Sequence, residues 1–304
     1  MSSLAKVTFS PHIHSGKSTS GIMLDVLISL LPATVAGVII FGLRALLVVA
    51  VCIVASIGFE ALFNLIIKKE QTVGDLSAAV TGLLLALNLP SDIPLWQCVV
   101  GSLFAIVVVK CLFGGIGKNV VNPAITARAF MLVAFGSMAL PSFPVDSVAT
   151  ATPLASETMP TLLDLFLGNH GGAIGETCSA ALLLGGLYLL VRRVITFHIP
   201  VAFIGTVFVF SFLMEGFNVT DALALILSGG LFIGAFFMAT DYTTSPSTPW
   251  GKVIFGLGAG LITCLIRYFG NYPEGVSFAI LFMNILTPYI SNLTKRKVFT
   301  KGGK

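Results

Sequence analysis

Charged side chains are scarce in this sequence. Asp, Glu, Lys and Arg make up 10% of the 304 residues, whereas a typical soluble domain has about a quarter. Hydrophobic residues reach 56%, so polar groups could not cover the surface of a soluble fold of this length. Much of the chain must therefore face lipid. Its apolar segments are long runs of Leu, Val, Ile, Ala and Phe without the alternation of barrel strands, which predicts an all-α integral membrane protein.

Two further absences concern paired cysteines and a cleavable leader. No two cysteines have the CxxC spacing of a zinc or iron–sulfur site, so we expect small packing residues and no metal site within this chain; the alternative is a cluster ligated jointly with another subunit. The cysteines are Cys52, Cys98, Cys111, Cys178 and Cys264. The first twenty residues are polar and contain no short apolar core before a cleavage site. The first membrane helix is therefore expected to act as the insertion signal.

Motifs for soluble chemistry are also absent. No Ser-His-Asp arrangement or carboxylate pair marks a hydrolytic site, and the glycines before Lys118 lack the preceding strand and the spacing of a phosphate-binding loop. The basic C-terminal tail needs no nucleic acid, because Lys and Arg gather on the cytoplasmic side of membrane proteins. We expect membrane lipid, and no nucleic acid, as a partner.

What the sequence does contain is a series of long apolar segments. A full helical crossing takes about 20 residues, and ten segments are candidates for such crossings. They are residues 22–42, 45–67, 76–90, 95–113, 122–140, 176–191, 197–214, 221–240, 251–269 and 275–293. The third is short, and we expect it to be broken or tilted.

The distribution of basic residues predicts the orientation of these segments. With the N-terminus in the cytoplasm, fourteen of the 17 Lys and Arg residues, Lys110 among them, fall on the cytoplasmic side. Only Arg44 and Arg267 fall on the opposite side, and Arg128 lies within a span. The longest loop, residues 141–175, contains no Lys or Arg and is expected outside. Both termini are then cytoplasmic, in a bacterial or archaeal cell membrane.

The two halves of the sequence resemble each other. Residues 74–96 and 220–250 both open near an acidic residue and end in a Pro-rich turn closed by Trp, and residues 110–119 match 266–275. Each unit holds five segments, so two like units must insert in opposite senses, as inverted repeats. The expected organisation is a tail (1–21), a first five-helix repeat (22–140), an external loop (141–175), a second five-helix repeat (176–293) and a basic tail (294–304).

Polar residues within the apolar segments are candidates for ligand or ion contacts. Arg128 lies inside the fifth segment, where a charge is costly, and contacts a flavin or ion, forms a structural ion pair, or snorkels. Asn119 and Asn122 precede that helix and either hydrogen-bond a ligand or cap the helix, with capping favoured. Asp25 and Glu60 are candidates for an ion path or for packing against a polar neighbour.

The external loop carries the most informative motif. Residues 140–160 are rich in Ser, Thr and Pro, which fits a solvated surface loop. A loop of this length is, however, usually functional or disordered. Within it, Asp146 is followed by small residues and then by Thr-Ala-Thr-Pro-Leu.

These residues resemble a known family. The stretch 146–154 is similar to the flavin-attachment motif of the family that contains the D subunit of Rnf complexes and the B subunit of sodium-pumping NADH:quinone reductases. Residues 117–130 (GKNVVNPAITARAF) and 237–251 (FMATDYTTSPSTPWG) resemble two further signatures, and the polar segment 10–16 also fits. The resemblance therefore covers most of the chain.

The resemblance implies a covalent FMN. In this family a flavin transferase joins the FMN phosphate to a threonine of the motif, which here is Thr152, with Thr150 as the second choice. The other motif residues are Asp146, Ala151, Pro153 and Leu154. Proline after the acceptor disfavours helix at Thr152, as an accessible hydroxyl requires. The resemblance also implies an additional riboflavin, without assigning its ligands.

The implied function is that of a membrane flavoprotein subunit in a redox-driven pump. Such a complex couples electron transfer between ferredoxin and NAD to Na⁺ or H⁺ translocation, and this subunit carries electrons through FMN without activity of its own. Expected partners are the other Rnf subunits (A, B, C, E and G), especially the FMN-bearing G subunit, and the flavin transferase. The alternative is a channel or transporter of the five-plus-five type without a flavin.

Overall fold

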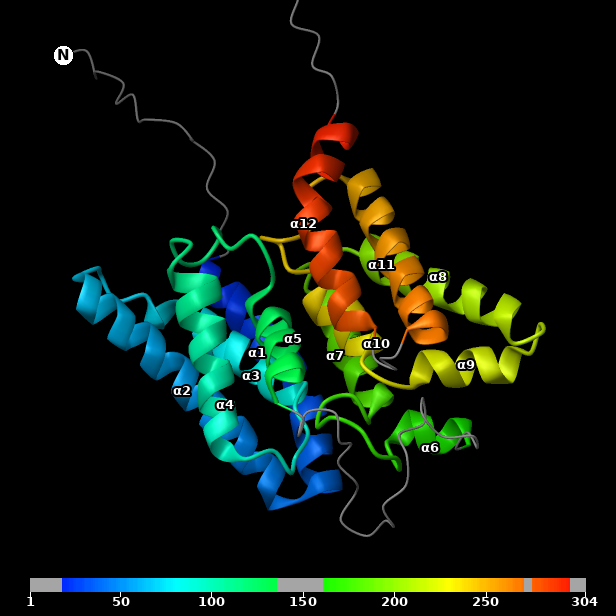
Figure 1. The fold of residues 1–304 in the computed structure, drawn as a ribbon, viewed down its shortest axis with the longest axis horizontal. Helices are drawn as coiled ribbons and strands as arrows, with labels where there is room; N and C mark the ends of the chain where they lie inside the picture. Colours follow the sequence, from blue (N-terminus) through cyan, green and yellow to red (C-terminus); the bar gives the residue numbers. More distant parts are fainter. Residues whose placement is uncertain (1–17, 136–160, 271–274, 296–304) are drawn as a thin grey trace, which may run out of the picture.

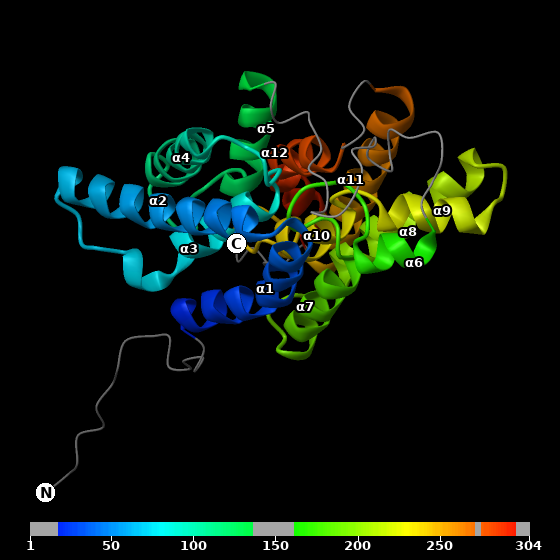
Figure 2. The same cartoon turned by 90° about the horizontal axis from the view of Figure 1, so that it is seen from below.

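The computed structural model describes residues 18–135, 161–270 and 275–295, which fold into helices joined by short connections (Figure 1). The first half of the chain occupies one side of the molecule and the second half the other, and the view from below in Figure 2 shows the same division. Because every helix satisfies its backbone groups internally, this architecture suits a hydrocarbon solvent.

The first half contains five α-helices, a short 3-10 turn and a π-helical segment. These are α1 (Thr19–Phe41), α2 (Leu43–Ile67), η1 (Val73–Asp75), α3 (Ser77–Leu87), α4 (Leu95–Leu103), η2 (Phe104–Cys111) and α5 (Pro123–Ala134). The π-helical η2 continues directly from α4, so the two form one rod with a widened final section.

The second half follows a similar plan. Its elements are α6 (Leu162–Leu167), α7 (Ser179–Val191), α8 (His198–Met214), α9 (Val219–Leu227), α10 (Leu231–Ile233), η4 (Gly234–Met238), α11 (Pro249–Phe269) and α12 (Val276–Thr294). The short helix α6 packs beside α7 and α9, at the lower edge of Figure 1.

The ten expected apolar segments correspond to ten helical segments of the described chain. Four helices, α1, α2, α11 and α12, are long and apolar enough to cross a membrane, and five segments are shorter apolar helices. The remaining segment pairs α9 with the helix Leu231–Met238, at an angle of 66°. The prediction of an all-α membrane protein is confirmed.

Two predicted boundaries are wrong. The fifth segment, expected over 122–140, stops at Ala134, because Phe135 has extended backbone angles. The eighth, expected to run unbroken over 221–240, breaks at Ser228–Gly230, where Gly229 has a positive φ of 69°. The third segment is short, as expected, with 11 residues in α3.

Local sequence signals fix several helix starts. Ser18, Asn122 and Thr248 each accept a hydrogen bond from a backbone N–H in the first turn of α1, α5 and α11. Proline follows at the first helical position of α5 and α11, where its missing N–H costs nothing. The predicted capping role of Asn122 is therefore confirmed.

Corresponding helices of the two halves meet at the centre. The first helices α1 and α7 pack together, and so do the fifth helices α5 and α12. At Gly185 of α7 an added Cβ would lie 2.0 Å from the carbonyl oxygen of Ser29 in α1. Such close helix contact needs a residue without a side chain. Like-with-like contacts of this kind are what a pseudo-two-fold relation between two repeats produces.

Outward-facing side chains are apolar along the long helices. Ile39 of α1 is 75% exposed, Val54 of α2 is 69% exposed, and Leu293 of α12 is 84% exposed. In water, so many exposed aliphatic groups would drive aggregation, but they match the acyl chains of a bilayer.

The segment before α7 differs from the surface loop that the sequence suggests. Residues 170–177 are not helical, yet all of them are buried. Ile174 and Gly175 donate their N–H groups to the carbonyl oxygens of Leu89 (3.1 Å) and Leu87 (2.7 Å) at the end of α3. The end of the expected external loop (141–175) is therefore inserted among the helices.

Candidate functional site

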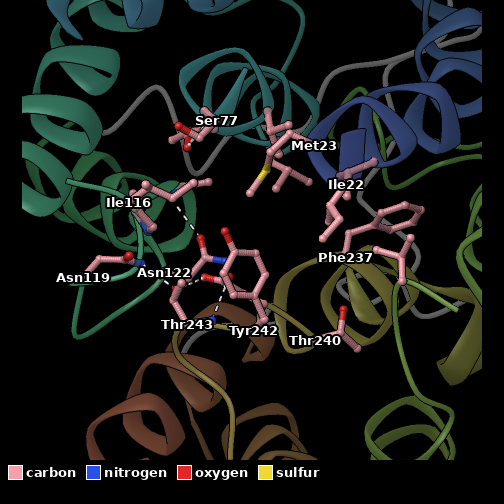
Figure 3. Close-up of a pocket in the computed structure, with 18 of the residues that line it drawn as sticks. Ile22, Met23, Ser77, Ile116, Asn119, Asn122, Phe237, Thr240, Tyr242 and Thr243 are labelled. Atoms are coloured by element: carbon pink, nitrogen blue, oxygen red, sulfur yellow. Dashed lines mark hydrogen bonds between the residues drawn. The ribbon is translucent and has the colours of Figure 1, made fainter. Parts of the chain in front are cut away.

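A pocket lies between the two halves of the molecule (Figure 3). About 810 Å³ of empty space lies within it, a volume that includes the solvent in its open mouth. The first half contributes residues from α1, α3, η2 and the start of α5, and the second half contributes α7, η4 and the segment after η4. Inverted-repeat proteins commonly bind their ligands at such an interface.

Most of the pocket wall is apolar. Met23 and Val26 of α1, Leu84 of α3 and Phe236 and Phe237 of η4 supply aliphatic and aromatic surface. The side chains of Phe232 and Phe236 also stack on each other with their centroids 6.3 Å apart. These surfaces suit the flat faces of an aromatic ligand.

One polar wall comes from the connections before α5 and after η4. The Asn119 amide donates to the Thr243 hydroxyl (3.0 Å), and the Asn122 amide donates to the Met238 carbonyl (3.3 Å). Both contacts join the first half to the second, while Asn122 also caps α5 through its oxygen. Asn119 and Asn122 therefore line the pocket, as the prediction of ligand contacts requires, and also hold its two sides together.

Asp241 is the acidic group of this polar wall. Its carboxylate accepts hydrogen bonds from the Thr243 N–H (3.3 Å), the Thr243 hydroxyl (2.9 Å) and the Thr244 hydroxyl (3.3 Å). Burial raises the pKa of the Asp241 carboxyl, and the hydrogen bonds from Thr243 and Thr244 oppose that rise. The group is thus a stronger proton acceptor than an exposed aspartate.

The opposite polar wall is formed by Lys110 and Ser77. Lys110 belongs to η2 and Ser77 begins α3, and the ammonium donates to the hydroxyl over 2.5 Å. Lys110 is 3% exposed, so it does not lie among the cytoplasmic surface cations with which the sequence grouped it. Its charge is held by an ion pair with Glu60 of α2 (2.8 Å).

Arg128 does not line the pocket. It lies deeper in the interface, where its guanidinium pairs with the Glu176 carboxylate (2.8 Å) and donates to the Asn88 side chain (2.7 Å). Among the alternatives for Arg128, the geometry matches the structural ion pair. The pair links α5 to the buried segment before α7.

Asp25 also lies outside the pocket lining. Its carboxylate pairs with Arg192 (3.2 Å) and accepts a hydrogen bond from the Tyr188 hydroxyl (3.0 Å), so it joins α1 to the end of α7. Glu60 lies behind the pocket wall, paired with Lys110. Among the described residues no group of three His, Cys, Asp or Glu side chains could hold a metal ion.

The threonine motif lies outside the described residues. This applies to Thr152 and Thr150, and equally to Asp146, Ala151, Pro153 and Leu154. The described chain stops at Phe135, at the end of α5, and resumes at Thr161, before α6. The helix α5 starts at the pocket with Asn122 as its N-cap and ends at Ala134, before the motif in the sequence.

Several pocket residues were not predicted. Lys110 was counted as a surface cation, and Ser77 was not singled out, because their pairing joins residues far apart in the sequence. Asp241 and Thr243 fall within the 237–251 stretch, which had been noted only as a resemblance. A polar cluster that interrupts two apolar segments was the signal that could have identified them.

The fold and the pocket define a multi-pass helical membrane protein with a largely apolar pocket between two related halves. The family described as NQR2, RnfD, RnfE matches residues 6–300. The chain belongs to this family, and the resemblance inferred from the sequence is confirmed.

Several curated relatives match along nearly their full length. The D subunit of the Na(+)-translocating ferredoxin:NAD(+) oxidoreductase complex of Acetobacterium woodii is 47% identical, over 96% of this chain and 94% of that protein. The D subunit of the proton-translocating ferredoxin:NAD(+) oxidoreductase complex of Clostridium ljungdahlii is 41% identical, over 95% and 94%. The D subunit of the ion-translocating oxidoreductase complex of Actinobacillus succinogenes is 33% identical, over 96% and 97%.

Proposed function

We propose that this chain is the membrane flavoprotein subunit of a redox-driven ion pump, in which it carries electrons through FMN attached to Thr152. The complex couples ferredoxin and NAD redox chemistry to the translocation of Na⁺ or H⁺, as the names of its relatives state for them. The observation that carries the flavin is the stretch 146–154, a threonine motif of small residues in a chain that matches the family from end to end.

The pocket supports a second, non-covalent flavin, riboflavin. Its apolar walls, with Phe236 and Phe237, fit the faces of an isoalloxazine ring, and the side chains of Asn119, Thr243 and Lys110 fit the ring's polar edge. When bound, the ring would accept and pass on electrons. The chain's own residues would bind and orient it and exclude water from its faces.

The proposed riboflavin would lie at the start of α5, and the segment that carries Thr152 follows the end of that helix in the sequence. That helix has 12 residues, which corresponds to roughly 18 Å along its axis. With both termini in the cytoplasm, the pocket faces the cytoplasmic side and the Thr152 loop faces the outside. Electrons would then cross the membrane by transfer between the riboflavin and the FMN.

The partners follow from the same assignment. The other Rnf subunits (A, B, C, E and G) would supply the ferredoxin and NAD sites and the remaining redox centres, and the FMN-bearing G subunit is the expected neighbour on the outer side. A flavin transferase would attach the FMN during maturation. The surrounding lipid contacts the apolar outer faces of the helices.

The attachment site can be tested on a denaturing gel. The chain is co-expressed with a flavin transferase, and the gel is illuminated with ultraviolet light. A fluorescent band is expected for the wild type and for Thr150→Ala, and it should disappear in Thr152→Ala. A missing wild-type band, or a band that persists in Thr152→Ala, would overturn the assignment and favour the channel alternative.

A further inference from the structure

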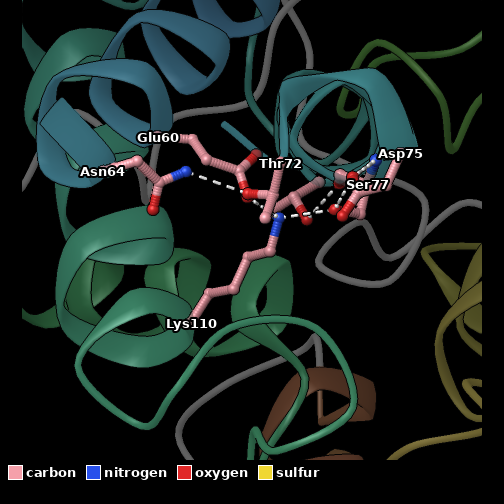
Figure 4. Close-up of polar contacts among 7 residues, drawn as sticks. Glu60, Asn64, Thr72, Asp75, Ser77 and Lys110 are labelled. Carbon is pink, nitrogen blue, oxygen red and sulfur yellow. Dashed lines mark hydrogen bonds and ion pairs between the residues drawn. The ribbon is translucent and has the colours of Figure 1, made fainter. Parts of the chain in front are cut away.

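A cluster of buried polar side chains lies behind the pocket wall formed by Lys110 and Ser77 (Figure 4). Lys110 rises from η2 toward the carboxylate of Glu60 in α2 and the hydroxyl of Ser77 in α3, so that three elements of the first half meet at its ammonium group. The cluster is not needed to close the pocket, which apolar side chains could do. Its chemistry therefore requires its own explanation.

The hydrogen bonds of the cluster form a continuous chain. The Lys110 ammonium donates to the Ser77 hydroxyl (2.5 Å), and the Ser77 hydroxyl donates to the Asp75 carboxylate (2.5 Å). Asp75 also accepts the Ser77 backbone N–H (2.8 Å), which fixes its position at the start of α3. Each neighbouring pair is therefore close enough to exchange a proton.

The two ends of this chain lie in different environments. Lys110 and Ser77 line the pocket and are buried. Asp75 is only half-buried in the turn η1, and its neighbour Gly74 is exposed. The hydrogen bonds thus run from the half-buried turn η1 to the wall of the pocket.

Glu60 supplies the counter-charge. Its Oε1 atom accepts from Lys110 (2.8 Å) and from the Thr72 hydroxyl (3.0 Å), while its Oε2 atom is buried and has no hydrogen-bond partner in the described part of the chain. A buried ion pair contributes little stability, because desolvation offsets the attraction. The Oε2 atom adds a further cost, because burying an acceptor without a hydrogen-bond donor lowers the stability of the folded state.

We propose that Lys110, Ser77 and Asp75 form a path that carries protons from the surface at η1 to the ligand in the pocket. The inference rests on the proposed flavin in that pocket, since a flavin ring gains protons as it gains electrons. The Lys110 ammonium gives one proton to the reduced ring and becomes a neutral amine. Asp75, protonated from solvent, gives a proton to the Ser77 oxygen as the Ser77 hydroxyl passes its own proton to Lys110. The ammonium is restored, Asp75 is again a carboxylate, and one proton has moved inward.

Glu60 is a positioning residue in this path. Its carboxylate holds the Lys110 side chain beside Ser77 and supplies the opposite charge at 2.8 Å. The unpartnered Oε2 atom leaves Glu60 free to change its hydrogen bond as the charge on Lys110 changes.

Other ionisable groups surround Lys110 and contribute to any pH profile. Glu60 and Lys69 approach from α2 and its end, Asp75 from η1, and Cys111 adjoins Lys110 in η2. Asp241 and Tyr242 approach from the segment after η4, across the pocket. A pH profile alone would therefore not identify the path, and substitutions are needed.

The entrance of the path is tested with Asp75→Asn, which keeps the oxygen that accepts the Ser77 N–H but cannot pass on a proton. In the assembled complex, the expected result is slower proton uptake during reduction, followed with a pH-indicator dye, with an unchanged content of extractable riboflavin. A small weak acid such as hydrazoic acid should restore the rate. The matched control is Asp221→Asn, which changes the aspartate at the corresponding place in the second half, hydrogen-bonded to Asn218 and distant from the pocket lining.

The inner end is tested with Lys110→Met, which removes the donor and should slow proton uptake by about a hundredfold. Because this change leaves Glu60 unpaired, the double variant Glu60→Gln/Lys110→Met provides a second measurement without a buried lone charge.

The outcomes separate the two proposals. Absence of riboflavin from the wild-type complex would refute the proposed flavin. Riboflavin present with unaltered proton uptake in Asp75→Asn and in the double variant would overturn the path. The path is also wrong if Na⁺, rather than a weak acid, restores the rate in Asp75→Asn.

Discussion

The two halves of this molecule share a helical plan but differ in the charges they bury. In each half the second helix carries or ends beside a glutamate, Glu60 in α2 and Glu215 after α8. Glu60 is paired with the Lys110 ammonium, whereas Glu215 accepts a hydrogen bond from the neutral Tyr268 hydroxyl (2.9 Å). Where residues 110–119 match 266–275, Lys110 corresponds to Ile266, so the second half has no lysine there.

The fifth helices show the same contrast. When the same alignment is continued beyond residues 119 and 275, Arg128 of α5 corresponds to Asn284 of α12. Arg128 reaches Asn88 at the end of α3 and pairs with Glu176. In the amide orientation that matches donors with acceptors, the Asn284 side-chain nitrogen donates to the Thr244 carbonyl (3.3 Å). Its side-chain oxygen accepts from the Asn122 N–H (3.2 Å). A polar contact exists in both halves, but only the first half uses a charge.

This difference teaches that two repeats can share a helical frame while differing in the side chains buried at two corresponding places. Buried ion pairs cost desolvation energy that hydrogen bonds between neutral groups largely avoid. At the places of Lys110 and Arg128 the first half therefore carries charges that the frame does not require, since Ile266 and Asn284 stand at the corresponding places of the second half. Substitutions at corresponding places can test this reading.

The largest expected effect is at Arg128. In Arg128→Met the Glu176 carboxylate remains buried without its cation, and the free energy of unfolding should fall by about 3–5 kcal/mol. Asn284→Leu, the matched change in the second half, should cost only about 1–3 kcal/mol because it leaves neutral groups unsatisfied. Thermal unfolding in detergent measures both. Equal losses would remove the distinction between the halves.

The second-largest effect tests whether the Glu60–Lys110 ion pair stabilises the fold or serves the activity of the complex. Replacing both residues with apolar ones, in Glu60→Leu/Lys110→Met, should leave stability unchanged or raise it by about 1–4 kcal/mol. Electron transfer by the assembled complex should fall in the same variant. A clear loss of thermal stability would instead mean that the frame itself depends on the pair.

A smaller effect is expected at the neutral counterpart. Tyr268→Phe removes one hydroxyl from a half-buried contact with Glu215, and the free energy of unfolding should fall by about 1 kcal/mol. The contents of covalent FMN and riboflavin should not change, and measuring them after extraction and on gels provides the check. A loss of either flavin would show that the second half also serves a cofactor.

The smallest effect is a pH dependence at Asp241. Its raised pKa means that the folded state binds this proton more tightly than the unfolded state, so stability falls as the pH rises from about 4 through the higher folded value. Asp241→Asn should remove this part of the dependence. Melting temperatures of both proteins across the acid range measure it, and parallel curves would contradict the expectation.

The sequence predicted the helical segments well, because the hydropathy of a short stretch is enough to identify a membrane helix. Each of the ten apolar segments became a helix or a helix pair, since a run of apolar residues decides this without regard to partners. The break at Ser228–Gly230 was missed because apolar residues continue on both sides of it. The early end of α5 was missed because Phe135 prolongs the apolar run although its backbone is extended.

The site was predicted only in part. Asn119 and Asn122 were predicted to contact a ligand or to cap a helix; both line the pocket, and Asn122 caps α5. Lys110 was misplaced at the surface, because its pairing with Glu60 joins positions 50 residues apart and leaves no local pattern. The partner of Arg128, Glu176, lies beyond the long loop and was not considered for the same reason.

The buried segment 170–177 also bears on how the protein is made. The carbonyl groups of Leu87 and Leu89 leave the ribosome long before Ile174 and Gly175 can bond to them. On its other side, Glu176 lies against Gly230, which is synthesised later still. The end of α3 therefore lacks these hydrogen bonds until the segment before α7 has been synthesised, and that segment lacks its contact with Gly230 until α9 has followed. Biogenesis of this protein should accordingly be sensitive to truncation after α8, even though every helix of the first half would then be complete.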